Sequence, residues 1–296
     1  KWSQALWIDT MAPVIIETPE NKRRSPQRNR MRISVVIPAL NEAGNIGRLV
    51  EETFEHVPSD MLAEVIVVDD GSEDATQDEL VAMMGTGKYP GLRVISHKER
   101  SGQSTALRTG ITAATSTIIA TMDGDGQNDP RDIPKLVAAL AEPGTAGPAL
   151  VNGWRKDRKD TGSKRFASRA ANGIRDAILR DNCPDTGCGI KAYWRDAYMR
   201  LPFFTSMHRY LPAFFQTYGL EVANVPVNDR PRQAGVSKYN NLNRALVGLY
   251  DLIGVSWLRR RTRVPVTAEL TTSATTSNRA AIAQPTNTQP RPVQGN

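Results

Sequence analysis

The acidic run MDGDGQNDP (122–130) holds the side chains of this sequence that are best suited to chemistry. Asp123 and Asp125 stand two positions apart, glycines between and after them let the backbone fold closely, and the amide of Gln127 follows. Carboxylate and amide oxygens are hard ligands of the kind that Mg²⁺ or Mn²⁺ prefers. The run therefore predicts a divalent metal site at Asp123, Asp125 and Gln127. An ion there can bridge a diphosphate and stabilise it as a leaving group.

Two further kinds of loop share the composition of the acidic run. A calcium EF-hand loop requires glycine at its sixth position and glutamate at its twelfth, where this sequence has Asn128 and Pro134. A plain surface turn also uses Asp and Gly, and it stays as the alternative. The metal site is favoured because so much acid follows directly on the apolar run TIIATM (117–122).

Polar residues also follow two earlier apolar runs. PALNEAGN (38–45) suits a turn that exposes backbone groups, and Asp69-Asp70 ends the next apolar run. Adjacent carboxylates repel each other unless they accept hydrogen bonds, for which a nucleotide base or ribose would be suitable donors. The alternative is an Asx-turn followed by a helix capped by Asp74.

Two basic stretches complete the set of candidate ligand-binding residues. Residues 154–169 (WRKDRKDTGSKRFASR) hold seven basic side chains, and RPRQAGVSKY (230–239) combines basic residues with Gly and Ser. Such runs are usually solvated surface, but beside an acidic metal site they are expected to face phosphates. Together with the metal site they indicate two anionic ligands.

The elements that must position these residues alternate between strand and helix. Apolar runs predict strands at 32–37, 63–68, 92–96, 117–122 and 149–153, with helices at about 45–56, about 103–114 and from Pro130 onward. Continuous apolar strands between helices predict an α/β fold with a mostly parallel sheet covered on both faces. In such sheets ligands bind beyond the carboxyl ends of the strands, which is where the polar residues lie.

Charge is concentrated at the two ends of the chain. The formal net charge is +7, residues 31–257 are nearly balanced, and residues 1–30 and LRRRTR (258–263) are basic. A nucleic-acid binder usually has a basic stripe across its folded body, so we expect no nucleic-acid partner. The pattern suits an anionic membrane surface better. Two cysteines and three histidines are too few for a disulfide framework or a structural zinc cluster.

Composition predicts four regions along the chain. We expect a disordered basic arm at 1–30, an α/β domain at 31–239, an amphipathic helix with an arginine cluster at 240–263, and a disordered tail at 264–296. No stretch reads as a signal peptide or as an apolar span of about 20 residues. These features predict a cytoplasmic protein that is peripheral on the cytoplasmic face of a membrane.

The predicted amphipathic helix supplies the membrane contact in this interpretation. Its apolar stripe and its basic end consist of Leu242, Leu246, Leu249, Ile253 and Trp257, then Arg259, Arg260, Arg261 and Arg263. An apolar face beside basic residues is typical of an interfacial helix. The alternative is that the stripe packs on the protein's own core or on another subunit, either a membrane-protein partner or a second copy in a homo-oligomer.

These motifs also resemble a known family. The chain resembles family-2 glycosyltransferases with the GT-A (Rossmann-like) fold, in particular polyprenyl-phosphate sugar transferases of the dolichyl-phosphate mannose synthase type. The matching pieces, in family order, are PALNE (38–42), VVDDGSEDAT (67–76), MDGDGQNDP (122–130), GWR (153–155), DTGCGIKAY (185–193) and RPRQAGVSKY (230–239). The resemblance covers about residues 32–263.

The resemblance implies a role for each candidate residue. Nucleotide-sugar binding falls to Pro38, Ala39, Asn41, Glu42, Asp69 and Asp70. Asp123, Asp125 and Gln127 would hold Mg²⁺ or Mn²⁺, and Arg155 would join Asp123 and Asp125 in catalysis by contacting phosphate. The acceptor phosphate would meet Lys164 or Arg165, Ser168, Arg232, Ser237 and Lys238. One departure is Asn228-Asp229, where relatives often have a histidine.

The implied reaction is inverting transfer of a sugar from a nucleotide-diphosphate sugar to a polyprenyl (dolichyl or undecaprenyl) phosphate. A phosphate acceptor needs no general base, because its second pKa is about 6. A sugar-hydroxyl acceptor and a non-catalytic sugar-nucleotide-binding subunit of a membrane complex stay as alternatives. A polysaccharide synthase would normally show Q-x-x-R-W and membrane spans, and a nucleotidyltransferase would show a basic glycine-rich loop after the first strand.

Overall fold

The computed structural model describes residues 32–156, 173, 175–231 and 241–265. The predicted arm at 1–30 and nearly all of the predicted tail at 264–296 therefore lie outside the described residues. The elements named in this section all belong to one compact unit that ends at Thr262.

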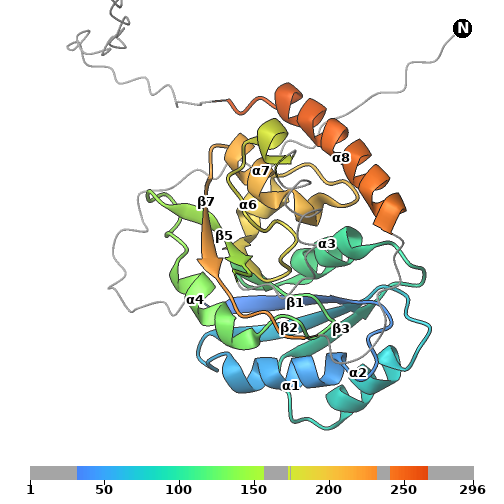
Figure 1. Ribbon diagram of the computed structural model, residues 1–296. Helices are drawn as coiled ribbons and strands as arrows, with labels where there is room; N and C mark the ends of the chain where they lie inside the picture. Colours follow the sequence, from blue (N-terminus) through green and yellow to red (C-terminus); the bar gives the residue numbers. More distant parts are fainter. Residues whose placement is uncertain (1–31, 157–172, 174, 232–240, 266–296) are drawn as a thin grey trace, which may run out of the picture. The chain divides into compact units, whose positions relative to one another are not determined.

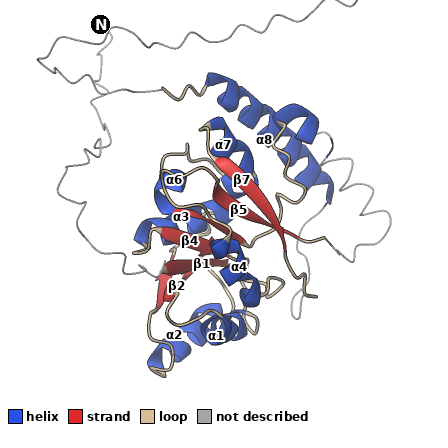
Figure 2. Cartoon of the chain, turned by 90° about the vertical axis from the view of Figure 1, so that its left-hand side faces the viewer, coloured by secondary structure: helices blue, strands red, loops and turns tan. Residues whose placement is uncertain are grey.

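A seven-stranded sheet forms the centre of this unit (Figure 2). Its strands are β1 (Ile33–Ala39), β2 (Leu62–Asp69), β3 (Leu92–Ser96), β4 (Ile118–Thr121), β5 (Pro148–Trp154), β6 (Lys191–Trp194) and β7 (Glu221–Pro226). They lie in the order β3-β2-β1-β4-β6-β5-β7. β6 runs antiparallel to both neighbours, and the other pairings are parallel.

Helices cover both faces of the sheet, as Figure 1 shows. They are α1 (Ile46–His56), α2 (Thr76–Gly85), α3 (Gln103–Ala113), α4 (Ile133–Ala138), α6 (Arg195–Met199), α7 (Leu211–Thr217) and α8 (Asn241–Arg261), with short 3₁₀ turns η2 (Pro130–Asp132) and η3 (Met207–Arg209). α1, α2 and α4 pack on the face of β1 that carries Val35 and Ile37. α3, α6, α7 and α8 belong to the core on the face that carries Val36.

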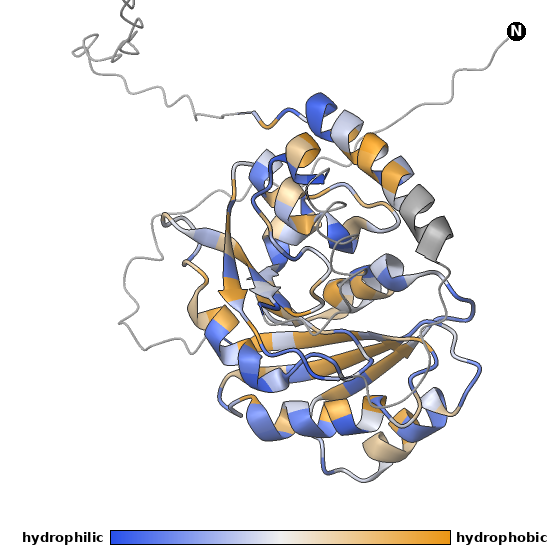
Figure 3. Cartoon of the chain, viewed as in Figure 1, coloured by the Kyte–Doolittle hydropathy of each residue, from blue (hydrophilic) through white to orange (hydrophobic). Residues whose placement is uncertain are grey.

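The central strands consist largely of hydrophobic residues, as the colours of Figure 3 show. Their side chains alternate between the two faces of the sheet, and both faces are buried. The mostly parallel α/β class and the five predicted strands are confirmed. β6 and β7 were not predicted. Helix α2 begins at Thr76, and Asp74 accepts a hydrogen bond from the Thr76 amide (3.0 Å) although Ala75 is the residue at the boundary.

Helix α8 is present, with its apolar residues divided between two sides. Leu252 and Val255 are buried in the core. The described members of the predicted stripe instead face solvent, Leu249 being 52% exposed, Ile253 64% and Trp257 59%. Packing of these three residues on the chain's own core is therefore wrong for the described unit. No helix among the described residues combines the length and the hydrophobicity that crossing a bilayer requires.

Candidate metal and nucleotide site

The loop after β4, residues 122–130, is the metal loop of the sequence prediction. The Asp123 amide donates to Asn128 Oδ1 (3.0 Å), and the Gln127 amide donates to Asp125 Oδ1 (3.1 Å). Asp129 caps the following 3₁₀ turn by accepting from the Arg131 amide (3.0 Å), and Pro130 is the first residue of that turn. These local bonds fix a tight loop that begins at the carboxyl end of β4.

Asp123 has the most strongly perturbed carboxyl group of this loop. Burial, followed by the charge of Asp125, raises the pKa of Asp123 to about 6, and the charges of Lys191 and Arg155 oppose this rise. Gln103, the first residue of α3, donates from Nε2 to Asp123 Oδ1 (2.7 Å). A buried carboxyl group whose pKa is raised by a second carboxylate is an electrostatic setting that a cation would relieve.

Glycines make the room that this carboxylate occupies. A Cβ on Gly189 would overlap the carboxyl atoms of Asp123, so no other residue fits there without displacing Asp123. A Cβ on Gly124 would lie 2.8 Å from the Pro38 carbonyl oxygen, so the metal loop rests directly against the end of β1. The first close approach leaves room for the Asp123 carboxylate, and the second sets the metal loop against β1.

The residues present fit a divalent ion. Asp123 and Asp125 could supply charged oxygen ligands, and Gln127 could supply an amide oxygen from the same loop. Among the described residues no three His, Cys, Asp or Glu side chains form a metal cluster. An ion held by Asp123, Asp125 and Gln127 could also take oxygen ligands from water or from a diphosphate.

Arg155, which directly follows β5, is held in a fixed orientation. Its Nε and Nη2 donate to the two carboxylate oxygens of Asp185 (2.8 and 3.0 Å), and Asp229 Oδ1 lies 4.0 Å from Nη1. Burial alone would lower the pKa of Arg155, but the bonds to Asp185 raise it. Arg155 therefore presents a permanent, oriented positive charge whose field reaches Asp123.

Asp69 and Asp70, at the end of β2, are buried and accept hydrogen bonds from the protein. Asp70 Oδ1 accepts from the Ser101 amide (2.9 Å) and lies 2.7 Å from His97 Nδ1, and its Oδ2 accepts from the Gly102 amide (2.7 Å). Asp69 accepts from the Ser72 amide (3.1 Å). In this structure Asp70 fixes the turn that leads to Gln103, and its contact with a nucleotide stays a prediction.

The two loops predicted to bind the nucleotide are joined to each other. The Asn41 amide donates to Ser72 Oγ (2.9 Å), and the Glu73 amide returns a bond to Asn41 Oδ1 (2.8 Å). Asn41 has φ +54°, a left-handed conformation that Asn tolerates well. The Glu42 amide donates to Thr76 Oγ1 (2.8 Å). Pro38 and Ala39 are buried at the end of β1, and Gly124 of the metal loop lies against the Pro38 carbonyl, so the predicted nucleotide loops and the metal loop are adjacent.

The structure thus brings together the predicted metal residues, the two nucleotide loops and Arg155. The predicted acceptor residues Lys164, Arg165, Ser168, Arg232, Ser237 and Lys238 lie outside the described residues. Sequence reasoning assigned no role to Gln103, Asp185 or Gly189. Asp185 and Gly189 belong to the matched piece DTGCGIKAY, so a signal existed, but only the three-dimensional contacts identify their partners.

Several known proteins have sequences similar to that of this chain. The model of glycosyl transferase family 2 matches residues 34–201, which is more than half of the chain. A dodecaprenyl-phosphate galacturonate synthase of Rhizobium johnstonii is 34% identical over 78% of this chain and 68% of the relative. An undecaprenyl-phosphate 4-deoxy-4-formamido-L-arabinose transferase of Edwardsiella ictaluri is 30% identical over 75% of this chain and 66% of the relative. The chain thus spans about two thirds of the length of these relatives.

Solved structures show the same fold. Glucosyl-3-phosphoglycerate synthase from Mycobacterium tuberculosis, crystallised with Mg²⁺ and uridine diphosphate, has a TM-score of 0.61 at 23% identity, over 81% of this chain and 82% of that chain. The structure of the same enzyme with Mn²⁺, UDP-glucose and phosphoglyceric acid has a TM-score of 0.59 at 25% identity, with the same coverage of both chains. The GT-A class expected from the sequence is confirmed, and the chain belongs to glycosyl transferase family 2.

Proposed function

We propose that this protein transfers a sugar from a nucleotide-diphosphate sugar to a polyprenyl phosphate. The observation that carries the proposal is the placement of Asp123 and Asp125 beside the joined nucleotide loops. The matched relatives of R. johnstonii and E. ictaluri are named for transfer involving dodecaprenyl and undecaprenyl phosphate, which supports the acceptor class. The sugar and the base are left to experiment.

The chain's own residues would act by binding and orientation. Asp123, Asp125 and Gln127 would hold Mg²⁺ or Mn²⁺, and the ion would supply charge stabilisation to the leaving diphosphate. Gln103 holds the Asp123 carboxylate by a hydrogen bond, and Gly189 leaves room for it. Arg155, oriented by Asp185, would add positive charge near the phosphates. A phosphate acceptor is largely ionised at neutral pH, so alignment of two anions is the main task.

The acceptor contacts stay a sequence prediction. We propose that Lys164 or Arg165, Ser168, Arg232, Ser237 and Lys238 bind the phosphate of the lipid, because charge-assisted bonds suit a dianion. Replacement of Lys238 by Ala should raise the acceptor KM more than the donor KM. Equal changes in both constants would contradict this assignment.

A panel assay tests the function. The purified protein would be incubated with labelled nucleotide sugars that vary in base and sugar, with undecaprenyl phosphate in vesicles, and with Mn²⁺ or EDTA. We expect label in the lipid fraction for at least one donor and none with EDTA. Label that appears only on phosphorylated small molecules with a free hydroxyl would instead support a sugar-hydroxyl acceptor.

We further propose that α8 attaches the protein to an anionic membrane surface, on the cytoplasmic face. Leu249, Ile253 and Trp257 form an exposed apolar stripe, and Arg260 and Arg261 follow it on the same helix. Arg259 does not belong to this basic end, because it donates to Thr217 Oγ1 (2.7 Å) and to the Leu179 carbonyl. A groove of about 720 Å³ at this end of α8 is lined in part by Arg180 and Arg260, which add positive charge.

Vesicle co-sedimentation tests this attachment. Each basic residue near an anionic leaflet contributes about 1 kcal/mol, so replacing Arg260 and Arg261 with Gln should weaken binding about 30-fold. The matched control replaces Arg48 of α1 and Lys98 of the loop after β3, two exposed cations, with Gln and should bind like the wild type. A protein that ignores anionic vesicles at low salt would favour a membrane-protein partner or a second copy instead.

A further inference from the structure

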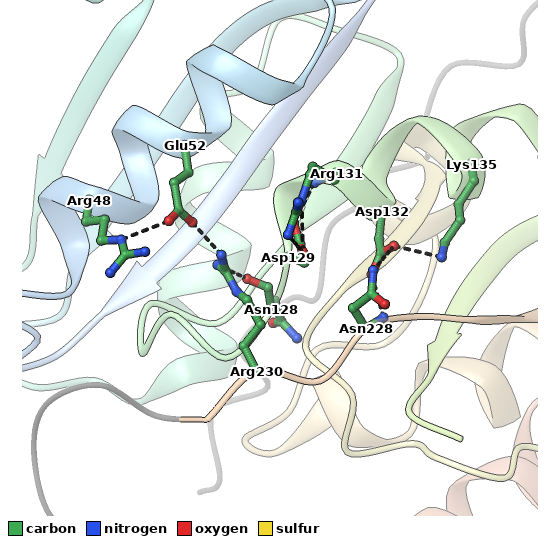
Figure 4. A network of polar contacts seen from close by, with 9 residues as sticks. All are labelled: Arg48, Glu52, Asn128, Asp129, Arg131, Asp132, Lys135, Asn228 and Arg230. Carbon is green, nitrogen blue, oxygen red and sulfur yellow. Dashed lines mark hydrogen bonds and ion pairs between the residues drawn. The ribbon is translucent and has the colours of Figure 1, made fainter. Parts of the chain in front are cut away.

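A cluster of polar contacts joins the metal loop to residues far away in sequence (Figure 4). At its centre is Arg230, which follows β7 and lies 178 positions from Glu52 of α1. Arg230 Nη1 donates to Glu52 Oε2 (2.6 Å), and Nη2 donates to the Asn128 carbonyl oxygen (2.6 Å). The Arg230 amide donates to the Gln127 carbonyl oxygen (3.0 Å). Glu52, Gln127, Asn128 and Arg230 thus form one cluster, the Arg230 cluster.

The Arg230 cluster reaches the predicted metal ligands through the backbone of the metal loop and the side chain of Asn128. Asn128 accepts from Arg230 at its carbonyl oxygen, and its side-chain Oδ1 accepts from the Asp123 amide (3.0 Å). Arg230 also holds the carbonyl of Gln127, a predicted metal ligand. The guanidinium and the backbone amide of Arg230 thus hold the carbonyl groups of two consecutive residues of the metal loop, Asn128 and Gln127. A planar guanidinium suits this task because its donors have a fixed geometry.

Glu52 fixes the guanidinium from the other side. Its side chain is only 14% exposed, and it accepts from both Arg230 and Arg48. Burial alone would raise the pKa of Glu52, but bonds from these two arginines lower it, so the carboxylate stays charged. Arg48 is 57% exposed and is bonded to Glu52 within the same helix. Arg48→Gln therefore offers a control that removes one bond to Glu52 and leaves the bond from Arg230 to Glu52 in place.

A second set of bonds anchors the same stretch of chain. Asp132, after the metal loop, accepts from the Asn228 amide (2.7 Å) and from Asn228 Nδ2 (3.1 Å). Asn128 and Asp229 form an antiparallel bridge. The stretch from Asn228 to Arg230 therefore stays beside the metal loop even when one side chain is altered, and this makes substitution of Arg230 informative.

We propose that Arg230 is a positioning residue that sets the conformation of the metal loop and thereby the affinity for the divalent ion. Glu52 orients the guanidinium of Arg230 from α1. The proposal rests on the metal role of Asp123 and Asp125 within the proposed function, and it is independent of the acceptor. Since Arg230 acts through the metal loop, its loss should change metal affinity more than turnover at saturating metal.

Mn²⁺ binding to the full chain tests this proposal. Electron paramagnetic resonance would be used to titrate Mn²⁺, alone and with UDP, into the wild type and into Arg230→Gln, Arg230→Lys, Glu52→Gln and Arg48→Gln. We expect the Mn²⁺ Kd to rise about tenfold for Arg230→Gln and about threefold for Glu52→Gln, with Arg48→Gln unchanged. The Mn²⁺ Kd of Arg230→Lys should lie between those of the wild type and Arg230→Gln. A lysine can pair with Glu52, but it cannot bond Glu52 and the Asn128 carbonyl with the fixed geometry of a guanidinium.

The possible outcomes distinguish the positioning role of Arg230, the metal assignment and the proposed acceptor from one another. Unchanged Mn²⁺ affinity in Arg230→Gln, or an equal loss in Arg48→Gln, would overturn the positioning role. If Arg230→Gln fails to fold in a thermal melt, Glu52→Gln and Arg230→Lys decide by the same titration. A wild type that binds no Mn²⁺ overturns both the metal assignment and the inference. A wild type that binds Mn²⁺ yet modifies no polyprenyl phosphate overturns the proposed acceptor alone.

Discussion

Two acidic pairs stand at the carboxyl ends of β2 and β4, which have β1 between them, and the protein treats the two pairs in opposite ways. Asp69 and Asp70 are buried and accept bonds from three backbone amides, with a histidine and a serine side chain beside them. Asp123 receives a side-chain amide from Gln103, lies against a glycine, and has a pKa raised to about 6 by burial and by Asp125. Hydrogen bonds from the protein satisfy the carboxylates of the first pair, whereas the two carboxylates of the second pair still repel each other.

The difference teaches that acid at a strand end is not by itself a metal site. A carboxylate that accepts several protein donors is stabilised in its charged form and orders the loops that donate to it. A pair whose like charges are only partly compensated gains from a cation. The same residue type therefore has a structural role in one loop and a predicted ligand role in the other. Substitutions in and around the two pairs should reveal this contrast, with effects that range from loss of activity to a modest change in stability.

The largest effect is expected from loss of a charge in the second pair. Asp125→Asn and Asp123→Asn should each lower transfer by at least about 100-fold, because a charged ligand of the ion at the leaving diphosphate is lost. Stability should not fall, since a repulsive charge is removed. Steady-state kinetics together with urea denaturation would check both parts. Wild-type turnover in either variant would show that this pair does not hold the ion.

Gly189→Ala should displace the carboxylate of Asp123 without changing its chemistry. The added methyl group would overlap the Asp123 carboxyl atoms, so Asp123 must move and Mn²⁺ affinity should fall about tenfold or more. Gly187→Ala is the matched control, because its nearest neighbours are at an ordinary 3.8 Å. Calorimetric titration with Mn²⁺ would compare the two. Equal affinity in both variants would mean that the position of Asp123 does not matter.

Asp70→Asn should affect stability, in contrast to the second pair. An asparagine amide cannot accept all the bonds from Ser101, Gly102 and His97, so unfolding should become easier by about 1–3 kcal/mol. Urea denaturation of Asp70→Asn beside Asp123→Asn would measure the difference. If both variants lose the same stability, the contrast between the two pairs is wrong.

Glu64 of β2 is another buried carboxylate that the protein's hydrogen bonds stabilise, and it should make the stability of the fold depend on pH. Burial alone would raise its pKa, but bonds from Thr115, Ser34 and Arg93 lower it from 4.5 to about 2. Because the folded-state pKa is the lower one, its stabilisation is complete above about pH 4.5 and is lost as pH falls toward 2. Between pH 5 and 2.5 the wild type should lose about 2 kcal/mol more than Glu64→Gln. Parallel stability curves for the two proteins would contradict this.

The strands of the fold were predictable where a local pattern exists. β1 to β5 follow from apolar runs, since strands buried on both faces read as continuous apolar stretches. β6 has only the four residues Lys191–Trp194, and its place between β4 and β5 is set by pairing with strands more than thirty residues away. Such pairing leaves no periodic signal in a short segment, so this strand was missed.

The site was predictable to a similar extent. The ligand types at Asp123, Asp125 and Gln127 follow from the residues themselves, and the fold places them at a strand end as expected. The partners that orient the site's side chains come from elsewhere, Gln103 from α3 and Asp185 from the segment before β6. Sequence spacing carries no information about these contacts, because they depend on how the loops meet across the sheet.

The central claim is that the second acidic pair holds the ion on which sugar transfer to polyprenyl phosphate depends. The most direct measurement is formation of sugar-labelled lipid by EDTA-treated protein as Mn²⁺ is restored, for the wild type, Asp125→Asn and Asp70→Asn. We predict a saturable rise for the wild type and no product for Asp125→Asn at any Mn²⁺ concentration. The folded fraction of Asp70→Asn should still form product only with Mn²⁺, because its predicted nucleotide contact affects donor affinity and not the dependence on the ion. Labelled lipid formed without a divalent ion, or equally by Asp125→Asn, would contradict the account.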